Sequence, residues 1–156
     1  MKKIIGIGEY FASKTPDILV TLGLGSCVGV CIWDKNKKIG GLIHVMLPKS
    51  PGGNVTKPGK YADLGIPLLL ENLKKLGGTN YTAKIFGGAA MFKGSSMDVG
   101  QKNTAAVKEQ LKKFSIRIIA EDTGGNRARS IEFNLETGEV MVKKVGGGEK
   151  VEIFKY

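Results

Sequence analysis

Histidine and cysteine are scarce in this chain, which has one histidine and two cysteines among its 156 residues. Two thiols and one imidazole argue against a zinc site, because no closely spaced second pair of ligands exists. Long apolar runs are also missing, since the longest, around residues 66–70, is far too short to cross a bilayer. The basic first residues lack the extended apolar region and cleavage site of a secretory signal. We therefore expect a cytoplasmic protein without membrane insertion.

The two cysteines, Cys27 and Cys31, lie four residues apart on one expected strand. At ~3.3 Å per residue, their Cα atoms are expected to be about 13 Å apart. A disulfide needs less than about 7 Å, so the pair is not expected to form one. Cys31 lies among apolar neighbours and is expected to be a buried small hydrophobic residue. Cys27 is therefore the thiol of chemical interest.

Acidic residues are few, with 14 Asp and Glu against 24 Lys and Arg, and the net charge is +10. Two interpretations stay open: a soluble, lysine-rich surface, or a surface for an acidic partner such as a negatively charged helical bundle or a nucleic acid. The lysines are scattered, and neither an aromatic ladder nor a long basic block is present. This pattern argues against a dedicated nucleic-acid groove.

Glycine motifs that bind phosphate are absent: there is neither a Gly-x-x-x-x-Gly-Lys loop nor a Gly-x-Gly-x-x-Gly fingerprint at a strand–helix turn. Glycine itself is abundant, at 23 residues, which is about twice the usual share of ~7%. We expect no nucleotide, metal or other cofactor. The glycines suggest tight backbone approach around a site, although turns alone explain part of this number.

The periodicity of apolar residues predicts a single mixed α/β domain of the α+β type over residues 1–156. Two main helices are expected over Tyr61–Leu76 and Gly100–Phe114, packed on mixed β-sheets, with a loop around residues 94–96 before the second helix. In that helix, the residues expected to face inward are Ala105, Val107, Leu111 and Phe114. Seven or eight strands are expected in total, from nine candidate segments near residues 3–11, 17–22, 28–33, 39–47, 82–86, 116–121, 130–134, 139–145 and 151–154.

The most informative of these elements is a hairpin whose two strands flank the polar residues 34–38. If residues 35–36 form a two-residue loop, Cys27 lies directly across from His44, with Cβ atoms roughly 4.5–5.5 Å apart. A loop centred on residues 36–37 makes the pair diagonal but keeps both side chains on one face. The hairpin therefore favours a thiol–imidazole pair.

A three-residue loop would place Cys27 and His44 on different faces of the hairpin. A bulge would restore the common face, and Gly40-Gly41 is a plausible position for one. The alternative to a catalytic pair is a buried thiol beside a core histidine whose hydrogen bonds are satisfied.

A thiol becomes a nucleophile at neutral pH when a neighbouring imidazole takes its proton. His44 would act as this base and then as the acid that protonates the leaving amine. Thr21 is the candidate for orienting the imidazole, because the glycine turn after it folds its strand end toward the hairpin. Asp17 and Asp34 are less conveniently placed.

The segment Gly25-Ser26-Cys27-Val28-Gly29 fits a nucleophile elbow with cysteine in place of serine. An elbow leads into a helix, whereas here a strand follows, so an α/β-hydrolase is a poor fit. The backbone nitrogens from Gly25 to Val28, including that of Ser26, are candidates for binding an oxyanion or the substrate. The Ser26 side chain points away from Cys27 on a regular strand, which weakens a serine mechanism. Lys57 and Lys60 either guide an acidic substrate or belong to a solvated loop.

Several ordered segments resemble the CheD family, the chemoreceptor glutamine deamidases of bacterial and archaeal chemotaxis. The resemblance covers nearly the whole chain. Where the family has Gly-Gly-x-x-Gly-Arg, this chain has Ala128 at the third glycine, and Val99-Gly100 replaces the usual Ile-Gly. The matching segments are Leu24-Gly25-Ser26-Cys27-Val28, His44-Val45-Met46-Leu47-Pro48, Lys60-Tyr61-Ala62-Asp63, Lys84-Ile85-Phe86-Gly87-Gly88-Ala89 and residues 116–125 with Arg129.

The resemblance implies a catalytic triad of Cys27, His44 and Thr21, and a fold similar to deamidating toxins of the cytotoxic necrotising factor type. The implied substrates are specific glutamines on the cytoplasmic helices of chemoreceptors. The implied partner is the phosphatase CheC, which would compete with the receptors. Alternatives are a related cysteine hydrolase acting on glutamate methyl esters or peptides, and a non-catalytic module that binds through its basic surface.

Overall fold

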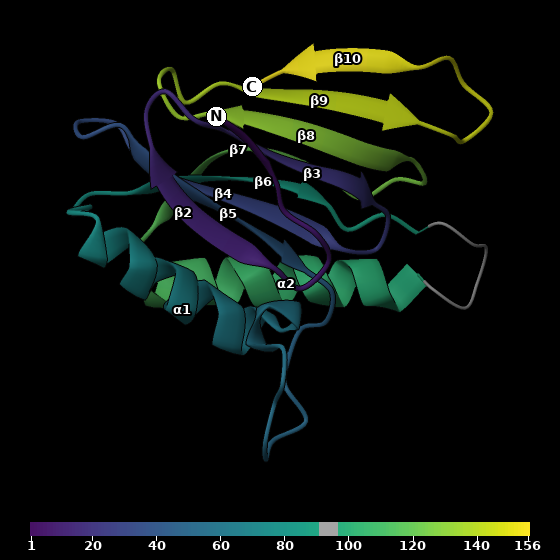
Figure 1. Cartoon of the computed structure of the whole chain (residues 1–156). Coiled ribbons are helices and arrows are strands. Elements are labelled where there is room, and N and C mark those ends of the chain that lie inside the picture. The colour runs from purple at the N-terminus through teal and green to yellow at the C-terminus, as the bar shows by residue number, and fades with distance from the viewer. Residues whose placement is uncertain (91–96) are drawn as a thin grey trace.

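Three layers make up the computed structural model, which describes residues 1–90 and 97–156 (Figure 1). Two five-stranded sheets pack face to face, and the two helices cover the other face of one of them. The first sheet, sheet A, has the strand order β1-β3-β8-β9-β10, and the second, sheet B, has the order β2-β5-β4-β6-β7. The expected mixed α/β class is confirmed.

The described residues form more strands than the sequence predicts, ten in place of seven or eight. The additional ones arise mainly because the single strand expected over residues 3–11 is two strands that belong to different sheets. The strands are β1 (Lys2–Ile4), β2 (Tyr10–Lys14), β3 (Ile18–Leu24), β4 (Val28–Asp34), β5 (Ile39–Val45), β6 (Thr82–Gly87), β7 (Arg117–Thr123), β8 (Ala128–Asn134), β9 (Val140–Val145) and β10 (Glu152–Lys155).

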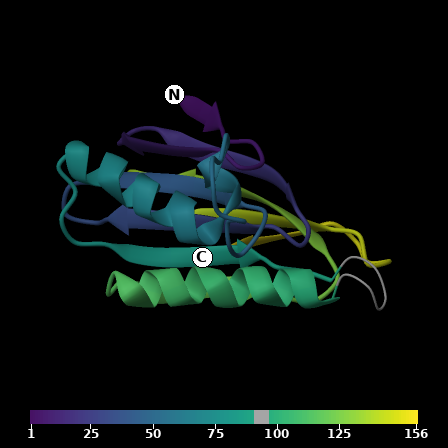
Figure 2. The same cartoon turned by 90° about the horizontal axis from the view of Figure 1, so that it is seen from below.

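The helices are α1 (Ala62–Lys75) and α2 (Met97–Lys113), preceded by a short 3-10 helix, η1 (Pro58–Lys60). They lie side by side below sheet B (Figure 2). Pro67 lies inside α1 without ending it. Val107 and Leu111 face inward as expected, but Ala105 and Phe114 are exposed, because the buried stripe of α2 passes through Gly100, Asn103, Val107 and Leu111. The loop expected at residues 94–96 lies outside the described residues.

Sheet B is buried on both faces because it is the middle layer. In β4, Val28, Val30 and Ile32 contact the helices. The alternate residues Cys31 and Trp33 face sheet A. This arrangement requires apolar side chains on both sides of β4, which explains why its sequence does not alternate between polar and apolar residues. None of the described helices is long and apolar enough to span a bilayer.

The hairpin of β4 and β5 differs in register by two residues from the direct pairing of Cys27 with His44. Gly29, and not Cys27, pairs with His44, and the ladder runs unbroken from Val28↔Val45 to Asp34↔Ile39. The direct pairing of Cys27 with His44 is therefore wrong, and the loop centred on residues 36–37 is confirmed. The Asp34 carboxylate selects this longer turn, because it accepts hydrogen bonds from the amides of Asn36 and Lys37.

The three-residue loop does not occur, and neither does the bulge at Gly40-Gly41 that it would have required, because the ladder through these residues is regular. The two glycines instead permit close packing: a Cβ atom on Gly41 would lie 2.6 Å from Leu69 of α1. The irregularity lies in β3, where the pairing with β8 shifts between Thr21 and Leu24. Both of these residues are fully buried.

Candidate active site

Three strands bring the predicted site residues to one end of the two-sheet sandwich. Thr21 comes from β3 in sheet A, and His44 comes from β5 in sheet B. Cys27 directly precedes β4 and packs against the core between the sheets. Since Gly29 lies opposite His44, the imidazole and the Cys27 side chain share the face of sheet B that is turned toward sheet A.

A hydrogen bond joins the two sheets here: Thr21 Oγ1 lies 2.7 Å from His44 Nδ1. The same hydroxyl donates to the carbonyl oxygen of Ile5 at 2.6 Å. Because a hydroxyl has one hydrogen and Ile5 takes it, Thr21 must accept its bond from an N–H at Nδ1. The lone pair of His44 is therefore on Nε2, as a general base requires.

The imidazole of His44 is fully buried. Burial lowers its pKa from 6.5 to about 4, so the ring is neutral at neutral pH. Its Nε2 atom has no hydrogen-bond partner among the described residues, and this includes Cys27. A buried nitrogen with a free lone pair is costly in a structural role and useful in a base.

Cys27 differs from Cys31 in its access to solvent, and neither forms a disulfide. Cys31 is buried, and burial raises the pKa of its thiol, which confirms the expected core role. Cys27 is only partly buried. Burial raises the pKa of its thiol as well, while a hydrogen bond from its own backbone amide acts in the opposite direction. The resting site therefore holds a neutral thiol next to a neutral base.

The loop before β4 is held through its carbonyl groups. The Gly25 carbonyl accepts a hydrogen bond from the amide of Ala89 at 2.8 Å, and the Cys27 carbonyl accepts one from Gly88 at 2.8 Å. At Gly87, which has φ +111°, a Cβ atom would lie 2.2 Å from the Cys27 oxygen, so only glycine permits this approach. The carbonyl groups of this loop are thus held by the amides of the segment that follows β6.

The amides of the same loop are free by contrast. Within residues 1–90 and 97–156, no backbone or side-chain oxygen accepts a regular hydrogen bond from the amides of Gly25, Ser26 or Cys27. Amide groups with no internal acceptor, next to a thiol, are suited to stabilising an oxyanion. The two aspartates considered for orienting His44 are occupied elsewhere: Asp17 bonds Ser13 and the N-terminus, and Asp34 holds the hairpin turn.

Comparison with known proteins agrees with this geometry. The model of the family described as CheD chemotactic sensory transduction matches residues 46–144. The chemoreceptor glutamine deamidase CheD of Thermotoga maritima is 57% identical to this chain over 98% of each protein. The chain belongs to the CheD family. Two proteins named probable chemoreceptor glutamine deamidase CheD are each 48% identical over 94% of this chain: that of Desulforamulus reducens over 93% of its length, and that of Clostridium botulinum over 94%.

The family match begins at Met46, directly after the strand that carries His44. Membership of the CheD family therefore does not itself test Thr21, Cys27 or His44. The evidence for these three residues is their arrangement in the structure.

Sequence reasoning missed one polar residue of this CheD family member's site, Asn103. Its side chain is fully buried and donates to the carbonyls of Ser26 and Met46. A signal was present in the sequence, because Asn103 precedes Val107 and Leu111 at helical spacing. A polar residue in the apolar stripe of a helix indicates a specific partner.

A buried charged cluster also supports the site and was not expected. Asp122 accepts hydrogen bonds from Arg129 at 3.0 Å and from the Tyr156 hydroxyl at 2.6 Å. Arg129 also donates to the carbonyl of Gly87, the residue that contacts the Cys27 loop. The cluster thereby ties the end of the chain to the backbone beside Cys27.

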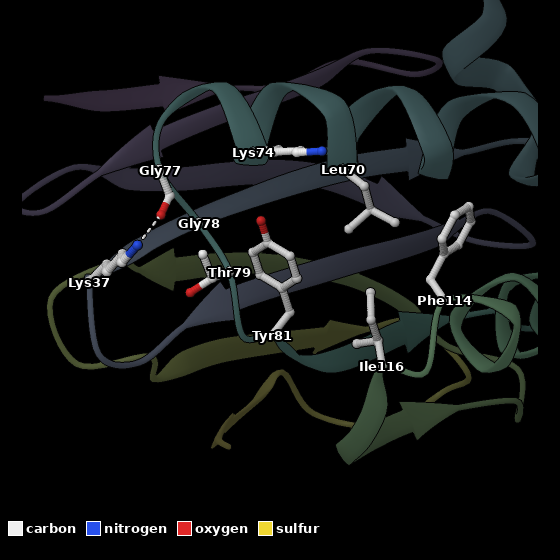
Figure 3. A pocket seen from close by; sticks show the side chains of 9 residues that line it. All are labelled: Lys37, Leu70, Lys74, Gly77, Gly78, Thr79, Tyr81, Phe114 and Ile116. Carbon is white, nitrogen blue, oxygen red and sulfur yellow. Dashed lines mark hydrogen bonds between the residues drawn. The ribbon is translucent and has the colours of Figure 1, made fainter.

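A cavity of about 670 Å³ lies elsewhere, between the turn of the hairpin and the C-terminal ends of the two helices (Figure 3). Lys37, Lys74 and Tyr81 are among its lining residues, and none of the predicted site residues is. It lies at the opposite end of β4 from Cys27, about 20 Å away at the rise of a seven-residue strand. The candidate active site is thus separate from this cavity.

Proposed function

We propose that this member of the CheD family is a chemoreceptor glutamine deamidase in which Cys27, His44 and Thr21 carry the reaction. The observation that supports this most directly is the hydrogen bond from His44 to Thr21, which leaves the lone pair of Nε2 on the face shared with Cys27. The names of relatives that cover nearly the whole chain support the substrate.

The reaction begins when His44 Nε2 takes the thiol proton and Cys27 Sγ attacks the glutamine Cδ. The carbonyl oxygen becomes an oxyanion, which the backbone amides of Ser26 and Cys27 stabilise, with Gly25 as a further donor. The tetrahedral intermediate collapses as the C–N bond breaks, and His44 delivers its proton to the departing ammonia. A thioester remains on Cys27.

Water completes the cycle. His44 removes a proton from the water molecule and the hydroxide attacks the thioester carbon; the C–S bond then breaks as His44 returns the proton to Cys27 Sγ, which restores the thiol. The products are glutamate and ammonia. Thr21 keeps the imidazole in the Nδ1–H tautomer throughout, because its hydroxyl hydrogen is committed to Ile5. No step requires a metal or an organic cofactor.

Access to the site suits a protein substrate. Cys27 is partly exposed at the end of the sandwich, so a glutamine side chain on a helix surface can reach the sulfur while His44 stays covered. The net charge of +10 favours an acidic partner. We assign the reaction to the cytoplasmic helices of chemoreceptors, where each event adds one negative charge and creates a carboxylate that can be methylated.

We further propose CheC as a protein partner. CheC would compete with receptors for the deamidase. A binding assay with and without receptor fragment tests this directly, and simultaneous binding of both partners would contradict it.

The test of the catalytic proposal is incubation of a purified receptor cytoplasmic fragment with the wild-type protein, Cys27→Ala and His44→Ala. The wild type is expected to release ammonia and to convert glutamine to glutamate in receptor peptides, as measured by mass spectrometry. Cys27→Ala is expected to lower kcat by at least about 10⁴-fold. Deamidation that persists in Cys27→Ala would refute the proposal.

Cys31→Ala is the matched control, since it removes a thiol from the same strand without touching the site. It is expected to keep kcat near the wild-type value. The assay also separates the rival functions: a methylesterase would release methanol and not ammonia, and a peptidase would cleave the receptor chain. A non-catalytic binding module would be insensitive to Cys27→Ala.

A further inference from the structure

Asn103 stands out because it is a fully buried polar side chain on the apolar face of α2. It lies four residues before Val107 and eight before Leu111, both of which belong to the core between α2 and sheet B. A leucine at this position would continue the stripe. The amide therefore serves some purpose other than apolar packing.

The side chain of Asn103 links the two flanks of the candidate site. Its Nδ2 atom donates to the carbonyl of Ser26 at 3.0 Å and to the carbonyl of Met46 at 2.9 Å. Ser26 directly precedes Cys27, and Met46 is two residues after His44. The orientation of the amide is fixed, because the flipped form would place Oδ1 against two carbonyl oxygens.

This link begins where the backbone ladder ends. The last pair between β4 and β5 is Val28↔Val45, and the register would next place Cys27 opposite Met46. Beyond Val28 the two segments have no further ladder pair. The two hydrogens of the Asn103 amide therefore replace the missing cross-strand bonds at the position of the nucleophile.

The oxygen of the Asn103 side-chain amide, by contrast, accepts no hydrogen bond from the described residues. Asn103 Oδ1 is buried and has no hydrogen-bond partner among the described residues. A buried acceptor without a partner reduces stability. The same site contains a second such atom, His44 Nε2, and both occur where the geometry of Cys27 and His44 is set. Stability alone does not account for this choice of residue.

We propose that Asn103 is a positioning residue that sets the separation of the Cys27 thiol from the His44 imidazole by holding Ser26 and Met46 together. The inference rests on the proposed thiol–imidazole chemistry. Asn103 acts through the backbone on either side and has no contact with the reacting atoms. Its removal is expected to leave receptor binding intact and to slow the chemical step.

The first experiment compares Asn103→Ala with the wild type in receptor deamidation. The expected result is a kcat lowered by about 10- to 100-fold, the effect of a small misplacement of reacting groups, with KM unchanged within a factor of about two. The matched control is Gln110→Ala, which removes an amide from the same helix about 10 Å farther from the site. Gln110 also has a buried side-chain oxygen without a partner. An equal loss in both variants would refute the proposal.

The second experiment needs no receptor. The rate at which iodoacetamide alkylates Cys27 is measured in the wild type, Asn103→Ala, His44→Ala and the double variant. Asn103→Ala is expected to slow alkylation in the wild-type background and to have no effect when His44 is already alanine, because its action passes through the pair. An equal effect in both backgrounds would show a merely structural role.

Folding is checked by circular dichroism and urea denaturation of each variant. If Asn103→Ala does not fold, Asn103→Ser carries the test, since it keeps one donor and is expected to lie between wild type and alanine. The two proposals fail differently. A wild-type protein that releases no ammonia refutes the deamidase assignment, while the alkylation cycle still decides the role of Asn103.

Discussion

The two ends of the β4–β5 hairpin each contain one fully buried ionisable side chain, Asp34 at the turn and His44 at the site. Asp34 is completely engaged, because its carboxylate accepts hydrogen bonds from the amides of Asn36, Lys37, Thr79 and Asn80. Only one ring nitrogen of His44 is hydrogen-bonded: Nδ1 bonds Thr21, and Nε2 has no partner among the described residues. Both side chains are equally hidden from solvent.

The difference shows that burial alone does not separate a structural role from the catalytic role proposed for His44, because the two buried side chains differ in their hydrogen bonds. Burial raises the pKa of Asp34 and the four amides lower it, and the amides prevail, so the carboxylate stays charged. No comparable donor acts on His44, so burial alone lowers its pKa and the ring stays neutral. One residue closes a turn, and the other keeps a lone pair available.

The largest expected effect is a contrast between alanine variants at the two ends. His44→Ala is expected to lower kcat by about 10³-fold, since it removes the general base, and to lower the free energy of unfolding by only about 1–2 kcal/mol through the cavity it leaves. Asp34→Ala is expected to lower the free energy of unfolding by about 3 kcal/mol, because four amides lose a charged acceptor. Ammonia release and urea denaturation measure the two. If His44→Ala mainly lowered stability and Asp34→Ala mainly lowered kcat, the comparison would be wrong.

The next effect concerns the bond between the sheets. Thr21→Val is expected to lower kcat by about 10- to 100-fold, the usual consequence of removing a group that orients a reactive imidazole. Thr21→Ser keeps the hydroxyl and is expected to recover most of the rate. The check is kcat at saturating receptor fragment. If valine and serine behave alike, the hydroxyl does not orient His44.

A smaller effect is expected from charges beside the site. The side chains of Lys57 and Lys60 pack on Gly8, whose amide bonds the carbonyl of His44 at 2.9 Å. Lys57→Glu with Lys60→Glu is expected to raise KM for an acidic receptor fragment about tenfold at low salt, and less at high salt.

The matched control for these charges lies at the other end of the hairpin, where Lys35 and Lys75 are exposed. Lys35→Glu with Lys75→Glu changes the net charge equally and is expected to leave KM near the wild-type value. Equal increases in KM would mean that only the total charge matters.

A further effect concerns the dependence of stability on pH. The pKa of His44 is lowered from 6.5 to about 4 in the folded protein, so between these values the unfolded chain binds a proton that the folded chain does not. The unfolding free energy therefore rises with pH across this window, by at most about 1.4 kcal/mol per pH unit from this group. His44→Gln is expected to flatten the curve in urea denaturation. An unchanged slope would show that His44 keeps its ordinary pKa.

The sequence predicted the hairpin and the common face of Cys27 and His44, because both follow from the alternation of apolar residues. It allowed two such registers and favoured the wrong one, because the structure has the loop centred on residues 36–37. The register depends on Asp34, whose carboxylate also binds the amides of Thr79 and Asn80, far along the chain. A turn stabilised from outside its own segment has no local signal.

The separation of β1 from β2 was missed for a similar reason. Residues 3–11 have the composition of one strand, yet β1 pairs with β3 in sheet A and β2 pairs with β5 in sheet B. The sheet that each strand joins is set by pairing with residues that are distant in the sequence. It also produces the site, because Ile5, in the connection after β1, provides the carbonyl that fixes the Thr21 hydroxyl.

The position of Thr21 has a consequence during synthesis of the chain. Its strand, β3, is held in sheet A between β1 and β8, and β8 belongs to the last third of the protein. Cys27 and His44 leave the ribosome long before β8 does. A nascent chain that already contains the proposed nucleophile and base therefore lacks most of sheet A, including the β8 neighbour of the strand that carries Thr21, until β8 has been made.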